Sequence, residues 1–450
     1  MSRYQRIGVL LLLALPASAF AEQDVQAEVT ELRQLLAELK SDYEQRITDL
    51  EARLQAAERA SKSAARKADD ALDTAEQTAI DQSSGSSSAN AFNPALSAIL
   101  NGQYARVDHG WNQIPGFMPA GEIGTGESGF ALGEAEVNMR ASVDSLFYGN
   151  LTLALHEEDG AIEPELEESW IQTTSLPGGI RATGGRFFSS AGYLNSFHRH
   201  ADDFADRPLP YQAFFGGAYT VDGARASWVA PTALLLEVGA EMNWGGGFPA
   251  TANHATEPGA WTLFAKLGGD AGASNSWLLG IARINADADS RSGGHDHETP
   301  GVVDTFSGDS KLTIADFVWK WAPNGNATLR SFKVQGEYFR RDENGLYAGL
   351  DYDGTQQGWY LQTVWQFAQR WRVGYRYDAV DTDNGANMVG TELQDPGHSP
   401  MRNSLMFDWS PSEFSRLRLQ YINDQVYADT DNLWLLQYIV SIGAHGGHQF

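Results

Sequence analysis

From residue 94 to the end of the chain, apolar and polar residues alternate in short stretches, which is the period of β-strands with two different faces. We expect strands at 95–107, 129–142, 146–155, 166–175, 180–188, 218–229, 233–243, 260–267, 276–285, 312–321, 329–340, 357–367, 371–379, 401–409, 414–423 and 433–450. These are about sixteen strands, and an even number is typical of bacterial barrels whose two ends lie on one side of the membrane. The alternation therefore predicts an all-β transmembrane β-barrel of antiparallel strands.

The connections between these segments alternate in length. Short turns such as 143–145, 177–179 and 410–412 alternate with long segments at 108–128, 188–217, 244–259, 286–311, 341–356 and 380–400. Bacterial barrels have short periplasmic turns and longer outer loops. We therefore expect both ends of the barrel in the periplasm and every long loop on the outside.

The two faces of the strands differ in charge. Val137 alternates with Glu136 in one strand, and Leu419 alternates with Arg418 in another. A charge on the lipid face at mid-membrane costs about 2–4 kcal/mol, so we expect a polar and charged lumen. The predicted pore-lining residues are Glu134, Glu136, Arg140, Arg181, Arg372, Arg376, Arg416 and Arg418. The arginines could form a basic ladder that attracts anions, or they could form cross-lumen ion pairs that brace the wall.

The long segment 188–217 is unlike a solvent-exposed loop, because aromatic residues such as Phe204, Tyr211 and Phe214 recur in it among charged residues. Such a segment should fold onto another surface, and in a barrel the inner wall is available. We expect it to enter the barrel and narrow the pore. Burial against a neighbouring subunit is the alternative.

The first 92 residues divide into three parts that precede a barrel at 93–450. Residues 1–21 have the basic start, apolar core and small-residue end of a secretory signal peptide. Residues 22–80 carry apolar side chains three or four apart with charged residues between them, which predicts a periplasmic coiled coil of two or three chains. A lone amphipathic helix packed on the barrel is the alternative. Residues 81–92 begin with a Ser-rich stretch and are predicted to be a flexible linker.

Composition excludes several classes of protein. No stretch offers the roughly 20 consecutive apolar residues of a transmembrane helix, which excludes a helical membrane protein. A formal net charge of −26 argues against nucleic acid as a partner, and the absence of cysteine excludes disulfides and thiolate metal sites. No nucleophile elbow, phosphate loop or zinc-protease motif is present, so we favour transport over catalysis and expect no enzyme.

Histidine and acidic residues gather in two of the predicted outer loops. Imidazole together with carboxylate suits zinc or another divalent cation. The candidate metal ligands are His198, His200, Asp202, Asp203, His295, Asp296, His297 and Glu298. A solvated polar loop is the alternative for both groups. In the last strand, Tyr438 and the terminal Phe450 match the alternating, aromatic ending that delivers a barrel to the outer-membrane assembly machinery.

Three stretches, 93–102, 207–214 and 443–450, resemble a group of proteobacterial outer-membrane proteins that are often called zinc-regulated or TonB-dependent receptors. A TonB-dependent receptor carries a plug domain and a 22-stranded barrel, whereas this chain has a coiled-coil pattern and material for about sixteen strands. The layout also resembles trimeric porins with a periplasmic coiled coil, of the dicarboxylate and phosphate-selective kinds. That resemblance implies a sixteen-stranded barrel, a third outer loop inside the pore and a homotrimer.

We therefore expect a passive porin in the outer membrane of a Gram-negative bacterium, in contact with outer-membrane lipid, that passes small charged solutes. The leading refinement is uptake of divalent metal, with zinc bound by the outer loops. The alternatives are an anion or dicarboxylate pore built on the lumen arginines, and a structural protein that tethers the outer membrane through its coiled coil.

Overall fold

The structure is a computed structural model that describes residues 40, 94–118, 123–158, 161–244, 248–249, 257–292 and 304–443. The predicted signal peptide, coiled coil and linker lie outside these residues, apart from Lys40. So do the metal-ligand candidates His295, Asp296, His297 and Glu298, and the terminal Phe450. Among the described residues, no helix has the length and hydropathy needed to cross a membrane.

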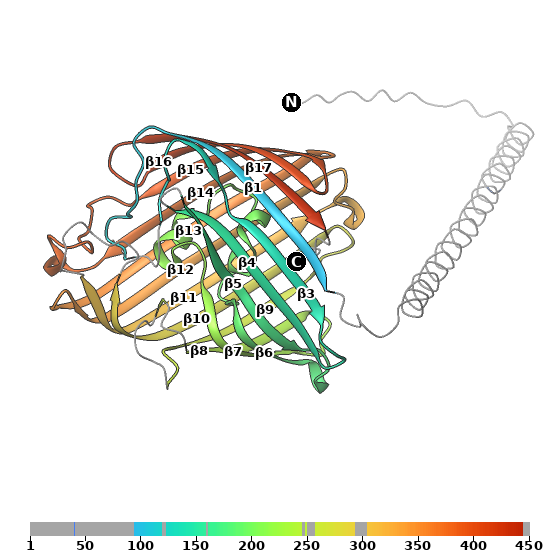
Figure 1. Ribbon diagram of the computed structural model, residues 1–450, viewed down its shortest axis with the longest axis horizontal. Coiled ribbons are helices and arrows are strands. Elements are labelled where there is room, and N and C mark those ends of the chain that lie inside the picture. The colour runs from blue at the N-terminus through green and yellow to red at the C-terminus, as the bar shows by residue number, and fades with distance from the viewer. Residues whose placement is uncertain are drawn as a thin grey trace, which may run out of the picture. The chain divides into compact units, whose positions relative to one another are not determined.

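The described residues of the barrel form one antiparallel sheet that closes on itself (Figure 1). The strands are β1 (Ala95–Val107), β2 (Gly129–Leu132), β3 (Ala135–Ser142), β4 (Phe147–Glu158), β5 (Ala161–Thr173), β6 (Ile180–Phe188), β7 (Thr220–Val229), β8 (Leu235–Asn243), β9 (Ala260–Asp270), β10 (Asn275–Ser292), β11 (Thr305–Trp321), β12 (Ser331–Tyr347), β13 (Leu350–Ala368), β14 (Trp371–Asp383), β15 (Met401–Ser412), β16 (Ser415–Gln425) and β17 (Asp431–Gly443). Each pairs with the next in sequence from β3 onward, and β17 pairs with β1. The sheet therefore has no free edge.

The predicted strand 129–142 is interrupted by a bulge. Both β2 and β3 pair with β1: Gly102 lies opposite Leu132, whereas Ile99 lies opposite Glu136. Three steps along β1 thus match four steps along its neighbour, so one residue is extra. With β2 and β3 counted as one position in the wall, the described residues form a barrel of sixteen strands, as the alternation predicts.

The prediction of two of the long loops is wrong, because strands continue into both segments. Segment 286–311 contains the end of β10 and the start of β11. Segment 341–356 is a tight hairpin in which β12 and β13 pair up to Tyr347 and Leu350, turning at Ala348 and Gly349, both with positive φ. The polar, Gly-containing sequence 341–345 has the composition of a loop, yet its alternate residues point inward and outward as in the rest of the strand.

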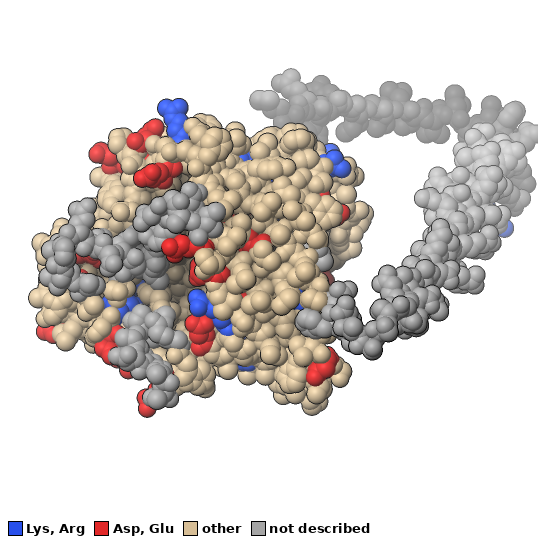
Figure 2. Space-filling model, in the orientation of Figure 1, with Lys and Arg blue, Asp and Glu red and all other residues tan. Residues whose placement is uncertain are grey.

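The two faces of the wall separate as expected. Val137 is 47% exposed on the outside, whereas Glu136 is 3% exposed on the inside. Leu419 is 44% exposed, whereas Arg418 is fully buried. On the face that Figure 2 shows, most of the visible wall belongs to uncharged residues. This outer band is the apolar surface that a membrane requires.

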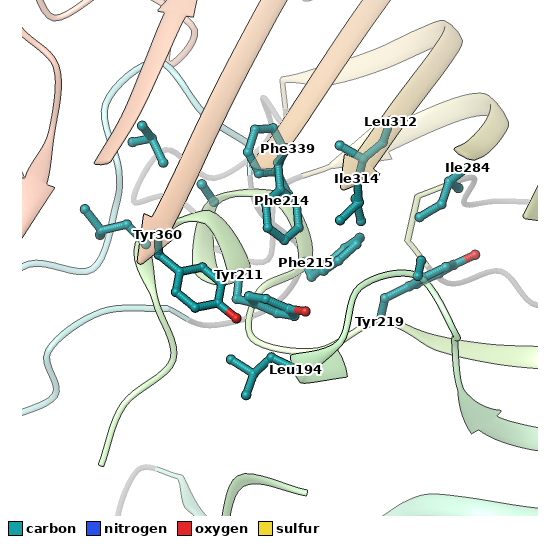
Figure 3. Close-up of a cluster of buried hydrophobic side chains, with 14 of the residues drawn as sticks. Leu194, Tyr211, Phe214, Phe215, Tyr219, Ile284, Leu312, Ile314, Phe339 and Tyr360 are labelled. Atoms are coloured by element: carbon teal, nitrogen blue, oxygen red, sulfur yellow. The ribbon is translucent and has the colours of Figure 1, made fainter. Parts of the chain in front are cut away.

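The prediction of a polar and charged lumen is wrong for part of the wall. Inward-facing positions of β10–β14 carry apolar side chains that form a buried cluster with residues of two inward-folded loops (Figure 3). The wall contributes Ile284, Leu312, Ile314, Phe339, Tyr360 and Val380, among others. These positions are apolar because they contact protein rather than water. The barrel therefore has a hydrophobic core inside it.

Candidate functional site

Residues 189–219, which we call loop 3, leave the wall after β6, fold into the barrel and return to the wall at β7. Loop 3 contains two short 3₁₀ turns, Leu194–Ser196 and Arg199–Ala201, and the helix α2 (Leu209–Phe215). The helix begins after Pro208 and ends at Gly216, whose left-handed φ of 65° suits glycine. All seven residues of α2 are buried. The prediction that this segment folds against the inner wall is confirmed.

Aromatic contacts fix α2 against the inner wall. Phe214 stacks on Phe339 with ring centroids 5.6 Å apart and planes 4° apart, and Phe117 meets Phe214 edge-on at 5.5 Å. Tyr211 donates a hydrogen bond to Glu337 Oε2 at 2.9 Å. Figure 3 shows Phe214 next to Phe339, with Tyr211 toward Tyr360. Buried aromatic contacts and a hydrogen bond therefore fix α2 of loop 3 against the inner wall.

On one side of the lumen, aspartates of loop 3 meet arginines of the wall. Asp206 lies 2.9 Å from Arg376 and 3.1 Å from Arg402. Asp203 forms ion pairs with Arg372, at 3.0 Å, and with Lys333. These contacts support the interpretation in which arginines brace the structure rather than stand free in the pore.

The remaining arginines of that wall are also engaged. Arg416 and Arg418 lie 3.6 Å and 3.7 Å from Asp408, and both donate hydrogen bonds to the backbone carbonyl of Asp202. The Asp202 carboxylate itself lies 2.6 Å from Arg207. Four of the predicted pore-lining arginines, Arg372, Arg376, Arg416 and Arg418, therefore hold loop 3 in place.

The charge of Asp203 is stabilised by this network. Burial raises the pKa of Asp203, but the nearby Lys333 and Arg372 outweigh the burial and hold that pKa well below its usual range. Asp203 is consequently a carboxylate at any ordinary pH. It has no imidazole partner among the described residues, and neither has Asp202, so the two aspartates do not join the histidines as the predicted metal site requires.

On the other side of the lumen, the histidines of loop 3 meet glutamates of the wall. His198 Nδ1 lies 3.1 Å from Glu136 and 3.0 Å from Glu167, and its Nε2 lies 3.0 Å from Glu168. His200 Nδ1 lies 2.6 Å from the other oxygen of Glu136. Both histidines are candidate ligands from the sequence alone. Nothing in the sequence indicates their partners in the wall, because these are 30 or more positions away.

The carboxylates also govern the protonation of His198. Burial lowers the pKa of His198, but the hydrogen bonds and charges of its three glutamate neighbours outweigh the burial and raise that pKa well above its usual range. Without another cation, His198 is therefore an imidazolium that bridges loop 3 and the wall. On the opposite wall, arginines connect the wall to loop 3 through ion pairs with its aspartates.

A cavity of about 860 Å³ lies between loop 3 and the wall from β3 to β10. It reaches Val229, Leu235 and Asp270, which lie beside the short turns at the end that we expect to face the periplasm. Its lining includes Glu136 and His198, and also Arg140, Arg181 and Lys266. Among the described residues these last three cations make no ion pair, unlike the arginines that hold loop 3. The assembly-signal candidate Tyr438 lies elsewhere, on the outer face of β17, and is 50% exposed.

No family model matches the chain. A protein of Aquifex aeolicus (strain VF5), described as uncharacterized, is 30% identical over 351 residues, which cover 72% of this chain and 70% of that protein. The two proteins belong to one family. The relationship carries no activity with it, because the relative has none assigned in its description.

Solved structures are similar to the barrel. The outer membrane channel DcaP of Acinetobacter baumannii is 12% identical, with a TM-score of 0.53 over 78% of this chain and 97% of DcaP. A loop L8 deletion mutant of OmpT, an outer membrane protein of Vibrio cholerae, is 9% identical, with a TM-score of 0.50 over 78% of this chain and 99% of that protein. Identities this low show the fold alone. The fold is a sixteen-stranded β-barrel like that of these outer-membrane proteins.

Proposed function

We propose that the protein is a porin of the outer membrane, through which small charged solutes diffuse passively. The observation that supports this most directly is loop 3, which narrows the lumen of a closed sixteen-stranded barrel and leaves a charged cavity beside it. An inner loop that restricts a lumen lined by charged side chains is how a channel selects solutes by size and charge. The barrel has neither the 22 strands nor, among its described residues, the plug of an energised receptor.

Current through planar lipid bilayers tests this function. The purified full-length protein should insert and produce stepwise conductance in KCl. A protein that enters the bilayer, as judged by flotation with liposomes, but carries no current would contradict the proposal. A structural role, in which the coiled coil tethers the membrane, would then be the better explanation.

We further propose that the pore prefers anions. Arg140 and Arg181 line the cavity without an ion pair among the described residues, so their charge is available to a solute. The prediction of divalent metal as cargo has less support, because Asp202 and Asp203 are neutralised by basic side chains. A dicarboxylate or phosphate has the charge and the acceptor oxygens that arginine recognises.

The reversal potential across a KCl gradient tests the preference. The wild-type protein should favour chloride, and the double variant Arg140→Ala/Arg181→Ala should shift the reversal potential toward cations. The matched control is Arg340→Ala, which removes an exposed arginine paired with Asp342; its reversal potential should equal that of the wild type. A cation-selective wild-type pore, or equal reversal potentials for all proteins, would contradict the anion preference without affecting the porin proposal.

We also propose that the barrel assembles as a homotrimer, with residues 22–80 as a periplasmic coiled coil. The spacing of apolar residues in that segment supports an oligomerising stalk. Deletion of residues 25–78, followed by a mass measurement of the detergent-solubilised protein, tests it. If the trimer mass persists after the deletion, the stalk has no role in assembly.

A further inference from the structure

We propose that Glu136, Glu167 and His198 form a divalent-cation site that fastens loop 3 to the wall of the barrel. The bound ion would be a structural component of the protein and not its cargo. The inference does not depend on the porin proposal, because cation binding and ion current are measured separately.

The ligand atoms already lie together. One atom from each of the three side chains, an imidazole nitrogen and two carboxylate oxygens, lies within 4.8 Å of the others. Glu136 belongs to β3, Glu167 to β5 and His198 to loop 3. A cation that is bound by nitrogen and oxygen in a site of this kind is zinc or a similar transition metal, because calcium and magnesium prefer oxygen alone.

A neighbouring glutamate orients the imidazole. His198 directs Nδ1 toward Glu136 and Glu167, and its Nε2 faces Glu168 at 3.0 Å. Glu168 is itself held by hydrogen bonds from Trp170 Nε1 at 3.0 Å and Asn150 Nδ2 at 3.1 Å. An imidazole that binds metal through one nitrogen and donates the other N–H to a fixed carboxylate is the usual arrangement around zinc.

The negative charge around the site exceeds the positive charge of fixed cations. The side chains of Glu136, Glu167 and Glu168 are all at least 88% buried, and in the described structure none of the three forms an ion pair with arginine or lysine. Buried carboxylates require a cationic partner. On the opposite wall, arginine and lysine provide one for Asp203 and Asp206 of loop 3, whereas here histidine stands in their place.

One buried oxygen still has no donor. Glu134 is 92% buried, and its Oε1 accepts no hydrogen bond from the described residues. Its carboxylate lies within hydrogen-bonding reach of Glu136, so it borders the site. The cavity gives access, since Glu136 and His198 line it.

Titration calorimetry on the full-length protein in detergent, stripped of metal with EDTA, tests the proposal with zinc chloride. We use the variant His295→Ala/His297→Ala as the background, so that the other histidine-rich segment does not contribute. One zinc ion per chain should bind. His198→Ala and Glu167→Gln should each weaken binding at least tenfold, which is the effect typical of losing a ligand or its support.

The control is His398→Ala, which removes a histidine whose ring nitrogens contact backbone carbonyls of Pro396 and Val426; its zinc affinity should equal that of the background. Glu167→Gln keeps the size of the side chain, so it decides the matter if His198→Ala fails to fold. Zinc should also slow hydrogen exchange in residues 194–202 of the background protein. No zinc binding, binding that persists in Glu167→Gln, or calcium binding as tight as zinc would each overturn the proposal.

Discussion

The packing of α2 against the inner wall makes Phe214 the side chain whose removal should release loop 3 most selectively. Phe214 is fully buried, stacks on Phe339 and receives the edge of Phe117. Replacing a buried phenylalanine by alanine costs about 3–5 kcal/mol. The cost falls on α2 rather than on the barrel, because backbone hydrogen bonds between strands hold the wall independently of this side chain.

The expected effect is faster local opening of α2 in Phe214→Ala. Since each 1.4 kcal/mol is a factor of ten, the lower figure of about 3 kcal/mol corresponds to roughly 100-fold faster hydrogen exchange in residues 209–215. Exchange measured by mass spectrometry on the folded protein gives this rate, with peptides from β13 and β14 as the internal reference. Their exchange should not change.

The matched control is Phe317→Ala, which removes a phenylalanine that is 40% exposed on the outer face of β11. It should leave exchange in α2 at the wild-type rate. Unchanged protection of residues 209–215 in Phe214→Ala, in a protein whose barrel is folded, would refute the conclusion that aromatic packing holds loop 3 in the lumen.

Three further predictions concern ion pairs and backbone. Asp206→Asn leaves Arg376 and Arg402 with Asp378 as their remaining carboxylate partner, so the free energy of unfolding in guanidinium should fall by about 1.5–3 kcal/mol. Gly185→Val should abolish assembly, measured as loss of the heat-modifiable band on gels, because Gly185 has a φ of 124° and an added Cβ would lie 2.1 Å from the Ser169 carbonyl oxygen. Because folding lowers the pKa of Asp203, its ion pairs should stabilise loop 3 fully above its ordinary pKa of 3.8 and lose that effect as pH falls below it. The protection of residues 201–205 against hydrogen exchange, taken relative to the intrinsic exchange rate at each pH, should then fall in acid.

Each of these has its own control. Asp342→Asn removes an exposed carboxylate and should leave the free energy of unfolding nearly unchanged; an equal loss in both variants would contradict the role of Asp206. Gly102→Ala adds a Cβ that meets no atom within 4 Å, so it should assemble, and assembly of Gly185→Val would show that the strand adapts. Asp203→Asn should remove part of the acid response of loop 3, and an identical response in both proteins would assign it to other groups.

The sequence predicts the wall well because each strand separates its two faces. Strand β1 has the predicted bounds, Ala95–Val107. The sequence predicts a loop where β12 and β13 form a hairpin, because Asp342 and Asn344 are turn-forming residues. In the structure, the inward-facing Arg341 and Glu343 are buried there. Residues 341–345 are polar on both faces, so no apolar alternation marks the strand there.

The candidate site could be predicted only in part. The aromatic content of loop 3 indicates that it folds inward, and His198 is a recognisable ligand type. Its contacts with Glu136 and Glu167 depend on the path of loop 3 across the lumen, which no local pattern specifies. The apolar part of the inner face is not predicted either. Ile314 faces inward while its neighbour Ala315 faces outward, and because both residues are apolar, the sequence does not show which one contacts lipid.

The hairpin of β12 and β13 is long enough to extend beyond the membrane. A strand that crosses a membrane needs about 9–11 residues, and β13 has 19, so with a rise of about 3.4 Å per residue some 30 Å of paired strand extends beyond the bilayer. In the orientation that the loop lengths predict, this paired hairpin projects from the cell surface. Its tip at Ala348 and Gly349 would be among the first parts of the protein that an antibody or a bacteriophage reaches, and a fixed mounting point for an inserted epitope.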